Sequence, residues 1–377
     1  MNRKIRILYL TMSTIPSVKA NTIQTINFCN ALSSMGVDVF LLVRSKLGEL
    51  SPSKLKKKIL EFYGTGRNIR VVPVYIPVIN SKNKRIEEIS YLISYFIYSF
   101  IACLLSNILR ITSRKRLYTF IRTPPLQVAY YLFTPFHRSQ IIYEMHNIYR
   151  RKTRSIFLRL FIASLNRTKL VITIIDFLRN IIERHIKISR TITLHNAYDP
   201  FILRCSDDER NLRKELGLPL NKWIVAYVGQ LWIWKNPEFL IDAFSLIKED
   251  DVILLFVGGT PEDIKRVSVY AQKKNVKNII FKGFVKPSLV PKYLKAVDCL
   301  VHYTPSTGNL KSYSPLKIPE YIAAGKPILA PKQPWIEEML HNGVNALFFN
   351  ENSPKDLADK IVLLKNNKDL AKRIAEN

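Results

Sequence analysis

A short run in the second half of the chain combines a glycine and a lysine in a way that can hold a phosphate group. The run is Val228–Asn236 (VGQLWIWKN), and it continues an apolar stretch typical of a buried strand. Gly229 lets a ligand approach the backbone closely, and Lys235, six residues later, supplies a positive point charge. Because a lysine near the start of a helix is usually solvated, this pair becomes a candidate phosphate site only through its context.

A second candidate is the segment Lys311–Ala330 (KSYSPLKIPEYIAAGKPILA), which predicts a helix. Ser314 is a favoured N-cap, Pro315 is a favoured first-turn residue, and Gly325 ends the helical pattern. The free N–H groups of such a helix start can hold a diphosphate. Glu320 would lie in this helix among apolar residues, where a carboxylate needs partners and can accept hydrogen bonds from two ribose hydroxyls.

Two further candidates follow expected strands in the first half of the chain. His146 belongs to the run EMHN at the carboxyl end of a strand, which is where α/β sheets place ligand residues. The loop Met12–Asn21 (MSTIPSVKAN) leads into a helix start at Asn21, which can hold an anion or only cap the helix. This loop lacks glycine, and neither GxGxxG nor GxxxxGK[ST] occurs, which argues against nicotinamide, flavin and P-loop enzymes.

Alternating apolar runs and helical patterns predict that two parallel sheets position these residues. The expected strands of the first half are Ile5–Thr11, Val37–Val43, Ile69–Ile76, Tyr118–Arg122, Ile141–Met145, Leu170–Ile175 and Thr191–Leu194. Those of the second half are Trp223–Gly229, Val252–Gly258, Asn278–Phe281, Cys299–Tyr303, Pro327–Ala330 and Ala346–Phe349. The fold class is therefore α/β, with two Rossmann-like doubly wound domains. We place them at residues 1–198 and 199–377 and expect ligands in the cleft between them.

The charge of the chain indicates anionic partners. Lys and Arg total 58 against 29 Asp and Glu, a net charge of +29, which suits nucleic acid, an anionic membrane or phosphorylated substrates. No helix-turn-helix, zinc-finger or RNP-like pattern appears, so we expect no nucleic-acid partner. The four cysteines are isolated, which argues against a disulfide framework or zinc ribbon and favours a reducing compartment. We expect no secretory leader, because the apolar start is short and lacks a small-residue cleavage site.

One segment does not fit the alternating plan. Ile89–Leu109 (ISYLISYFIYSFIACLLSNIL) has 21 residues without a charge, inside a helix expected over about 86–112. A single membrane span would separate the strands before it from those after it, and its basic flanks are equal at both ends. Two interpretations stay open: a helix lying in the membrane interface, slightly favoured by its aromatic residues, and an ordinary buried or dimer-forming helix.

Taken together, these segments resemble glycosyltransferase family 4. The run Ser314–Ala330 is similar to the family's SPLK-x-x-EY-x-AAGKP segment, and Ala226–Asn236 (AYVGQLWIWKN) resembles its phosphate segment. Ile15–Val39 resembles the first-loop variant with Ala-Asn in place of Gly-Gly. Leu194–Pro200 (LHNAYDP) and Phe281–Val285 (FKGFV) resemble the entry to the second domain and the segment beside the base. The resemblance implies the GT-B fold and sugar transfer from a nucleotide-sugar with retention of anomeric configuration.

The resemblance also implies roles for individual residues. Lys235 would bind the donor diphosphate, Glu320 the ribose hydroxyls, and His146 the donor sugar or the acceptor near the reacting carbon; these three are the expected catalytic residues. The other expected donor-binding residues are Gly229, Gln230, Phe284, Val285, Ser312, Ser314, Leu316 and Lys317. The expected acceptor-side residues are Asn21, Thr22 and Arg122.

Two positions depart from the family pattern. Ser312 stands where the family has a glutamate eight residues before Glu320, and that carboxylate normally holds the donor sugar. Gln230 stands where an arginine is usual, so one cationic contact is missing unless Lys311 or Lys317 supplies it. These departures keep open the alternative of a GT-B-shaped binding or scaffolding protein without catalysis; a basic nucleic-acid-binding protein is a more remote one.

The expected reaction needs no metal and no other cofactor, because Lys235 and the helix amides can offset the charge of the departing nucleoside diphosphate. The expected partners are a nucleotide-sugar (UDP-, GDP- or ADP-linked), a glycan or lipid-linked acceptor and an anionic membrane surface. These partners place the protein in the cytoplasm, peripherally at the inner face of the cell membrane, in the synthesis of cell-envelope polysaccharide.

Overall fold

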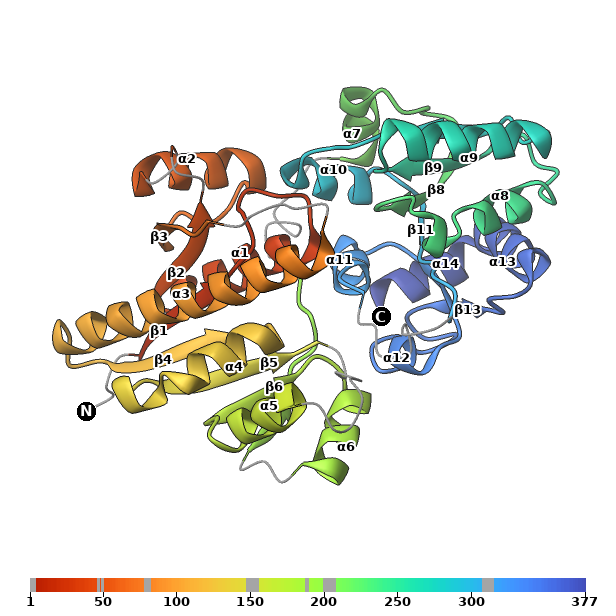
Figure 1. The fold of residues 1–377 in the computed structure, drawn as a ribbon. Helices are drawn as coiled ribbons and strands as arrows, with labels where there is room; N and C mark the ends of the chain where they lie inside the picture. Colours follow the sequence, from red (N-terminus) through yellow and green to blue (C-terminus); the bar gives the residue numbers. More distant parts are fainter. Residues whose placement is uncertain are drawn as a thin grey trace. The chain divides into compact units, whose positions relative to one another are not determined.

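The computed structural model describes residues 5–45, 48, 51–77, 83–146, 156–186, 190–198, 208–306 and 315–377. The chain divides into two compact units, Met1–His195 and Asn196–Asn377, each drawn in Figure 1. The boundary expected from the sequence, between residues 198 and 199, lies three residues later than this division. Each unit holds a parallel sheet with helices on both faces, so the predicted class of two Rossmann-like α/β domains is confirmed.

The described part of the first unit has seven parallel strands in the order β3-β2-β1-β4-β5-β6-β7. The strands are β1 (Ile5–Thr11), β2 (Asp38–Ser45), β3 (Arg70–Tyr75), β4 (Arg116–Ile121), β5 (Gln140–Met145), β6 (Leu170–Thr173) and β7 (Thr191–Thr193). The helices are α1 (Ala20–Ser34), α2 (Pro52–Tyr63), α3 (Lys84–Ile111), α4 (Pro124–Leu132), η2 (Thr134–Phe136), α5 (Ile156–Asn166) and α6 (Asp176–His185).

Alternate residues of β1 point to the two faces of this sheet. Tyr9 belongs to the core formed with α1 and α2, whereas Leu8 belongs to the core formed with α3, α4 and α5. Both faces are therefore covered, which explains why the strands read as continuous apolar runs. The strand order reverses at β1, between β2 and β4, and ligands of such sheets bind beyond the strand ends at this point.

The described part of the second unit has six parallel strands in the order β10-β9-β8-β11-β12-β13. The strands are β8 (Trp223–Val228), β9 (Val252–Val257), β10 (Ile279–Phe281), β11 (Cys299–Val301), β12 (Ile328–Pro331) and β13 (Leu347–Phe349). The helices are α7 (Glu209–Leu216), η4 (Ile233–Lys235), α8 (Glu238–Phe244), α9 (Pro261–Lys273), η5 (Pro287–Leu289), α10 (Val290–Lys295), α11 (Lys317–Ala324), α12 (Pro334–Glu337), α13 (Pro354–Asn366) and α14 (Lys368–Glu376). Here the strand order reverses at β8, between β9 and β11.

Some helices differ from the sequence-based expectation. α2, α5 and α7 were not predicted, and α7 begins in the charged run DDERNLRKE, residues 207–215. Asp208 caps α7 by accepting a hydrogen bond from the Arg210 N–H, and Gly217 ends it in the left-handed conformation, so local end signals were present. α11 begins at Lys317, later than the predicted start at Ser314 and Pro315, and places Glu320 in its first turn.

The predicted cap of α1 is wrong. The N-cap residue is Lys19, and no side chain caps the helix. Asn21 lies inside the first turn, where its side-chain amide donates to the Ser13 hydroxyl at 3.1 Å. Cys29, Cys103 and Cys299 are free and buried, in agreement with the absence of a disulfide framework among the described cysteines.

Candidate functional site

The strand end of β8 brings a glycine under a lysine of α11. Gly229 directly follows β8 with φ of 148°, a conformation that favours glycine. A Cβ atom at this position would lie 2.3 Å from Lys317 Cε and 2.4 Å from Lys317 Nζ. A larger residue here would displace the Lys317 side chain that crosses the end of the strand, and it would be strained at this φ.

A buried tyrosine fixes α11 to the sheet. The Tyr321 hydroxyl accepts a hydrogen bond from the Val228 N–H at 3.0 Å and donates to the Val301 carbonyl at 3.4 Å. The ends of β8 and β11 are thus joined to one turn of α11. This places Lys317 and the half-buried Glu320 at the point where the strand order reverses.

Two lysines lie here beside aromatic rings. Lys235 is only 7% exposed, and its Nζ lies 5.1 Å and 5.3 Å from the ring centroids of Trp232 and Trp234. Lys317 Nζ lies 3.6 Å from the ring centroid of Tyr227. Among the residues that the structure describes, neither lysine forms an ion pair, so aromatic rings are their observed neighbours.

Burial weakens the hold of both lysines on their protons. Burial lowers the pKa of Lys235 from 10.5 to about 8. Burial, followed by repulsion from Lys235, holds the pKa of Lys317 well below its usual range, and Glu320 acts in the opposite direction. The two ammonium groups are therefore close enough to repel each other, and an added anion would stabilise both.

A histidine that the sequence reasoning missed completes this group. His302 directly follows β11 and is 1% exposed, and neither ring nitrogen has a hydrogen-bond partner among the described residues. Burial, then the charges of Lys317 and Lys235, hold its pKa well below its usual value, so the ring is neutral. We call Lys235, Lys317 and His302 the lysine cluster; the place of His302 after an expected strand was the available signal.

The remaining donor residues named from the sequence lie nearby or outside the described part. The Gln230 carbonyl accepts a hydrogen bond from the Tyr227 hydroxyl at 3.3 Å, and Leu316 is the N-cap residue of α11. Phe284 is 50% exposed and follows β10 with Val285. The expected roles of Ser312 and Ser314, and the substitute contact from Lys311, fall on residues outside the described ranges.

Close glycine packing links the loop after β10 to Gly229. The Gly258 N–H donates to the Gly283 carbonyl at 2.7 Å, and Gly283 directly precedes Phe284. A Cβ atom on Gly258 would lie 2.4 Å from the Gly229 carbonyl oxygen. The segment expected beside the base is therefore hydrogen-bonded through its backbone to Gly258. Gly258 in turn packs against Gly229, the glycine next to Lys317.

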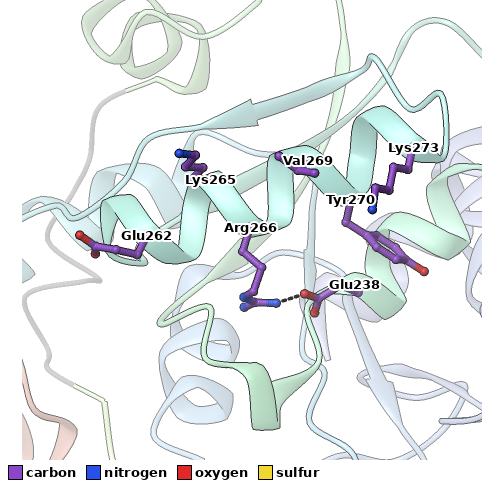
Figure 2. Close-up of a pocket in the computed structure, with 7 residues that line it drawn as sticks. All are labelled: Glu238, Glu262, Lys265, Arg266, Val269, Tyr270 and Lys273. Carbon is purple, nitrogen blue, oxygen red and sulfur yellow. Dashed lines mark ion pairs between the residues drawn. The ribbon is translucent and has the colours of Figure 1, made fainter.

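A groove of about 530 Å³ lies on the outer side of α8 and α9, near the loop that carries Lys235. Figure 2 shows Arg266 reaching from α9 to Glu238 at the start of α8, with which it forms an ion pair. Arg266 also donates to the Leu231 carbonyl at 2.5 Å, four residues before Lys235. The groove is thus distinct from the lysine cluster, but one of its side chains holds the same loop in place.

In the first unit, Arg122 brings together side chains from α1 and from the end of β5. It directly follows β4, and its guanidinium donates to Gln24 Oε1 at 2.5 Å and Thr25 Oγ1 at 3.0 Å, both on α1. Its Nε lies 3.3 Å from Glu144 Oε1 and 3.0 Å from His146 Nε2, at the end of β5. We call Arg122, Glu144, His146 and Gln24 the arginine cluster.

The charges of the arginine cluster offset each other. Burial alone would raise the pKa of Glu144, but Arg122 and His146 outweigh it and hold that pKa below its usual range. Burial and Arg122 lower the pKa of His146, although Glu144 opposes them. The cluster therefore carries one positive guanidinium, one negative carboxylate and a neutral imidazole.

Nε2 of His146 lies between the carboxylate and the guanidinium. It is 2.6 Å from Glu144 Oε1 and accepts a hydrogen bond from Arg122 Nε at 3.0 Å, with Arg122 Nη2 2.8 Å away. This ring nitrogen is thus held inside the arginine cluster, and Nδ1 is left for a hydroxyl group of a ligand.

The two α1 residues expected on the acceptor side have different surroundings. Asn21 is exposed, and its carbonyl accepts from Arg122 Nη1 at 3.1 Å, which joins it to the arginine cluster. Thr22 is buried, and its hydroxyl bonds the Ser17 and Lys19 carbonyls at 2.9 Å and 2.7 Å. Gln24 was missed, although it lies three residues after Asn21 and so on the same helix face. That the two clusters face each other across a cleft stays a prediction.

Comparison with known proteins supports the nature of the second unit. Residues 208–377 match the family described as Glycosyl transferases group 1. An uncharacterized glycosyltransferase of Methanocaldococcus jannaschii is 30% identical over 159 residues, which cover 42% of this chain and 40% of that protein. The alpha-monoglucosyldiacylglycerol synthase of Streptococcus pneumoniae is 26% identical over 156 residues, 41% of this chain and 34% of that protein. The chain thus spans less than half the length of these curated relatives.

Solved structures resemble the whole chain in fold. Anabaena HepE in complex with UDP-glucose matches 99% of this chain and 93% of that protein, with a TM-score of 0.70 and 19% identity. WaaG, a glycosyltransferase involved in lipopolysaccharide biosynthesis, matches 99% and 93% with a TM-score of 0.64 and 16% identity. At such identities the likeness concerns the fold alone. Both units thus have the fold of GT-B glycosyltransferases, and residues 208–377 match the model of the glycosyl transferases group 1 family.

Proposed function

We propose that the protein is a retaining glycosyltransferase of family 4 that moves a sugar from a nucleoside diphosphate sugar to a glycan or lipid-linked acceptor. The observation that carries this proposal is the lysine cluster. The buried Lys235, the half-buried Lys317 and a buried histidine converge at the strand ends of the second unit, and neither lysine has an ion-pair partner among the described residues. Buried charges without partners are unfavourable, so such a cluster suits a site that an anionic ligand completes.

A nucleoside diphosphate supplies the missing charge. Its two phosphates can bridge Lys235 and Lys317, whose mutual repulsion they would relieve. The first turn of α11 offers free N–H groups to the same anion. Glu320, in that turn, is placed to accept hydrogen bonds from the ribose hydroxyls. The solved HepE complex, in which a protein of the same fold holds UDP-glucose, supports this kind of donor.

The same cluster would promote departure of the leaving group. Cleavage of the bond between the sugar and the diphosphate leaves negative charge on the phosphate oxygens. Lys235 and Lys317 stabilise that charge without a metal ion, and one such contact typically contributes about 10²–10³ in rate. The leaving phosphate can then take the proton of the acceptor hydroxyl on the same face of the sugar, which retains the anomeric configuration.

The arginine cluster suits the binding of neutral sugar or acceptor hydroxyls. Its charges already offset each other, so it has little attraction for a second anion. Nδ1 of His146 can form a hydrogen bond with a hydroxyl, while Glu144 and Arg122 hold the other ring nitrogen. We therefore assign His146, Arg122 and Asn21 to the part of the site that receives the sugar.

The test is binding and turnover of a nucleotide-sugar panel. The full chain is titrated with UDP-, GDP- and ADP-sugars by calorimetry, and radiolabelled sugar transfer is followed with lipid and glycan extracts as acceptors. Tight binding of one donor and labelled product support the proposal, whereas no binding across the panel overturns it.

Binding without turnover would select a second candidate. A GT-B protein that keeps nucleotide-sugar binding but has lost catalysis is favoured by Ser312 and Gln230, which stand in place of an expected glutamate and arginine. In that case Ser312→Glu together with Gln230→Arg should not weaken donor binding and is expected to restore measurable transfer.

A further inference from the structure

The long helix α3 has its most apolar side facing outward. Its buried residues are mostly small or polar: Ser90, Ser94, Tyr98, Ser99, Ala102, Cys103, Ser106 and Leu109. Its exposed side carries large apolar residues: Ile86, Ile89, Tyr91, Leu92, Ile93, Phe96, Ile97, Phe100, Leu104, Ile108 and Ile111. A helix on the surface of a soluble domain normally shows the reverse arrangement. The outward side of α3 therefore exposes an apolar surface that an apolar neighbour would cover.

The inward side of α3 is already satisfied by the domain. The Ser94 hydroxyl donates to the Pro77 carbonyl at 2.7 Å, and the Tyr98 hydroxyl donates to the Leu42 carbonyl at 2.6 Å. Tyr98 also accepts from the Thr11 N–H at 3.0 Å. Small side chains let the helix lie close to the sheet. The outward residues are thus not core residues displaced by a rotation of the helix.

The apolar surface extends beyond the helix. With 28 residues, α3 is about 42 Å long, and Figure 1 shows it as the long orange helix beside α4. Asn107 donates to the Phe136 carbonyl at 2.8 Å, which holds η2 against the helix, and Phe136 is 69% exposed. Phe100 contacts Phe133 with ring centroids 5.9 Å apart. We call the exposed apolar residues of α3 together with Phe136 the α3 surface.

The sheet excludes a helix that crosses a bilayer. By length and composition alone, α3 is apolar enough to span a membrane. However, β1 pairs directly with β2, which precedes α3, and with β4, which follows it. A spanning helix would have to separate hydrogen-bonded strands of one sheet. An apolar contact of α3 must therefore be made along its side.

Charge indicates what covers the α3 surface. Between residues 84 and 116 the sequence has six basic and two acidic side chains, a net charge of +4, and the basic ones stand at both ends of the helix. Lys84, Arg85, Arg110, Arg114 and Arg116 are exposed. A second copy of the chain would bring these like charges together, whereas anionic lipid headgroups would pair with them.

We propose that the α3 surface lies flat in the headgroup region of an anionic phospholipid bilayer, with the basic helix ends on the lipid phosphates. The mode is that of an interfacial amphipathic helix, except that the helix is part of a folded domain. The proposal gives this face a partner and a location at a membrane, and neither depends on the activity of the second unit.

The experiment is flotation of the full chain with phospholipid vesicles, without any nucleotide-sugar. One set contains equimolar phosphatidylglycerol and phosphatidylcholine, and the other phosphatidylcholine only. The variant Phe96→Gln/Phe100→Gln/Leu104→Gln changes side chains that are 37–50% exposed, so the fold is expected to persist, as circular dichroism would check. The matched control is Leu246→Gln/Val344→Gln/Leu363→Gln, whose residues are 46–52% exposed in the second unit.

The proposal expects binding to anionic vesicles that the α3 variant lowers by at least about tenfold and the control leaves within about twofold. Replacing Arg110, Arg114 and Arg116 by Gln should remove the preference for anionic vesicles. The proposal is overturned if the wild type floats with neither set, or if the α3 variant floats as well as the control. A dimer in plain buffer that the α3 variant dissociates, without vesicle binding, would instead assign the surface to a second copy.

Discussion

The two units place polar clusters at the same topological position and treat charge in opposite ways. In each unit the cluster lies where the strand order reverses, next to the central strands β1 and β4 or β8 and β11. The arginine cluster pairs its guanidinium with a carboxylate at 3.3 Å. The lysine cluster has two lysines and a histidine with aromatic neighbours and no ion-pair partner among the described residues.

This difference separates a site that is complete from one that awaits a ligand. A cluster with paired charges holds its side chains in place before anything binds, and it favours neutral hydroxyl groups. A cluster of like charges in a buried setting destabilises the free protein and is relieved by an anion. The same fold thus carries a preorganised, charge-balanced cluster in one domain and a cluster of like charges in the other.

The largest effect is expected from breaking the pairing in the first unit. Glu144→Ala leaves the Arg122 guanidinium buried without its carboxylate, which should lower the free energy of unfolding by about 3–5 kcal/mol. All four tryptophans lie in the second unit, at 223, 232, 234 and 335. In urea, circular dichroism should therefore report the loss while the tryptophan fluorescence transition stays in place.

The matched control is Glu61→Ala, which breaks the exposed surface pair Lys57–Glu61 in the same unit. It should change the unfolding free energy by less than about 1 kcal/mol. If Glu144→Ala is no more destabilising than this control, the arginine cluster does not depend on its internal pairing.

The next largest effect should come from a substitution in the second unit. Unlike Glu144→Ala, it should leave the free energy of unfolding undiminished. Lys235→Met removes a buried charge that has no ion-pair partner among the described residues, so the tryptophan transition in urea should not weaken, while donor affinity or turnover falls by about 10²–10³. Lys365→Met is the control, because Lys365 is also largely buried but pairs with Asp251. Donor binding that survives Lys235→Met would remove Lys235 from the site.

The pH dependence should separate the two units further. The pKa of Lys235 is lowered to about 8, so the unfolded chain binds this proton more tightly and the second unit gains stability as pH rises from about 8 to 10.5. Donor binding favours the charged lysine, so affinity should fall by up to about tenfold per pH unit above 8. The two trends run in opposite directions and can be measured by urea titration and calorimetry.

The first unit should respond on the acid side. The folded protein lowers the pKa of His146 below 6.5 and of Glu144 below 4.5, so the unfolded chain takes up these protons more readily. Stability of this unit is then lost as the pH falls below about 6.5. If circular dichroism gives the same free energy of unfolding for this unit at neutral and acid pH, the assigned pairing is contradicted.

The smallest effect concerns the aromatic neighbours of Lys235. Trp232→Leu and Trp234→Leu each remove one ring about 5 Å from the ammonium group, a contact typically contributing about 0.5–1 kcal/mol. Donor affinity should therefore fall by less than about tenfold. Ile233→Ala, between the two and 74% exposed, is the control and should have no effect on calorimetric binding.

The sheets were predictable because parallel strands buried on both faces leave a strong apolar signal. Each expected strand is found, and β1 matches its expected bounds, Ile5–Thr11. Lys235, Arg122 and His146 could be named because each follows such a run closely. α7 was not predicted because its buried face holds few apolar residues, although its capping residue Asp208 and its terminal Gly217 were visible in the sequence.

The partners of the site residues could not be predicted in the same way. Gln24 and Arg122 are 98 residues apart, and only the order of the strands brings them together. His302 had the right position after a strand but no motif around it. The outward orientation of α3 depends on which side meets the sheet; the serines at 90, 94 and 106 were the one hint that its small residues lie inward.

Tyr321 gives the lysine cluster a built-in reporter. The Val228 amide, at the end of β8, donates its hydrogen bond to the Tyr321 hydroxyl of α11 rather than to a neighbouring strand. Exchange of that single amide with heavy water then requires α11 to lift from the sheet. Its protection factor thus measures the free energy needed to open this end of the sheet, with no substrate present.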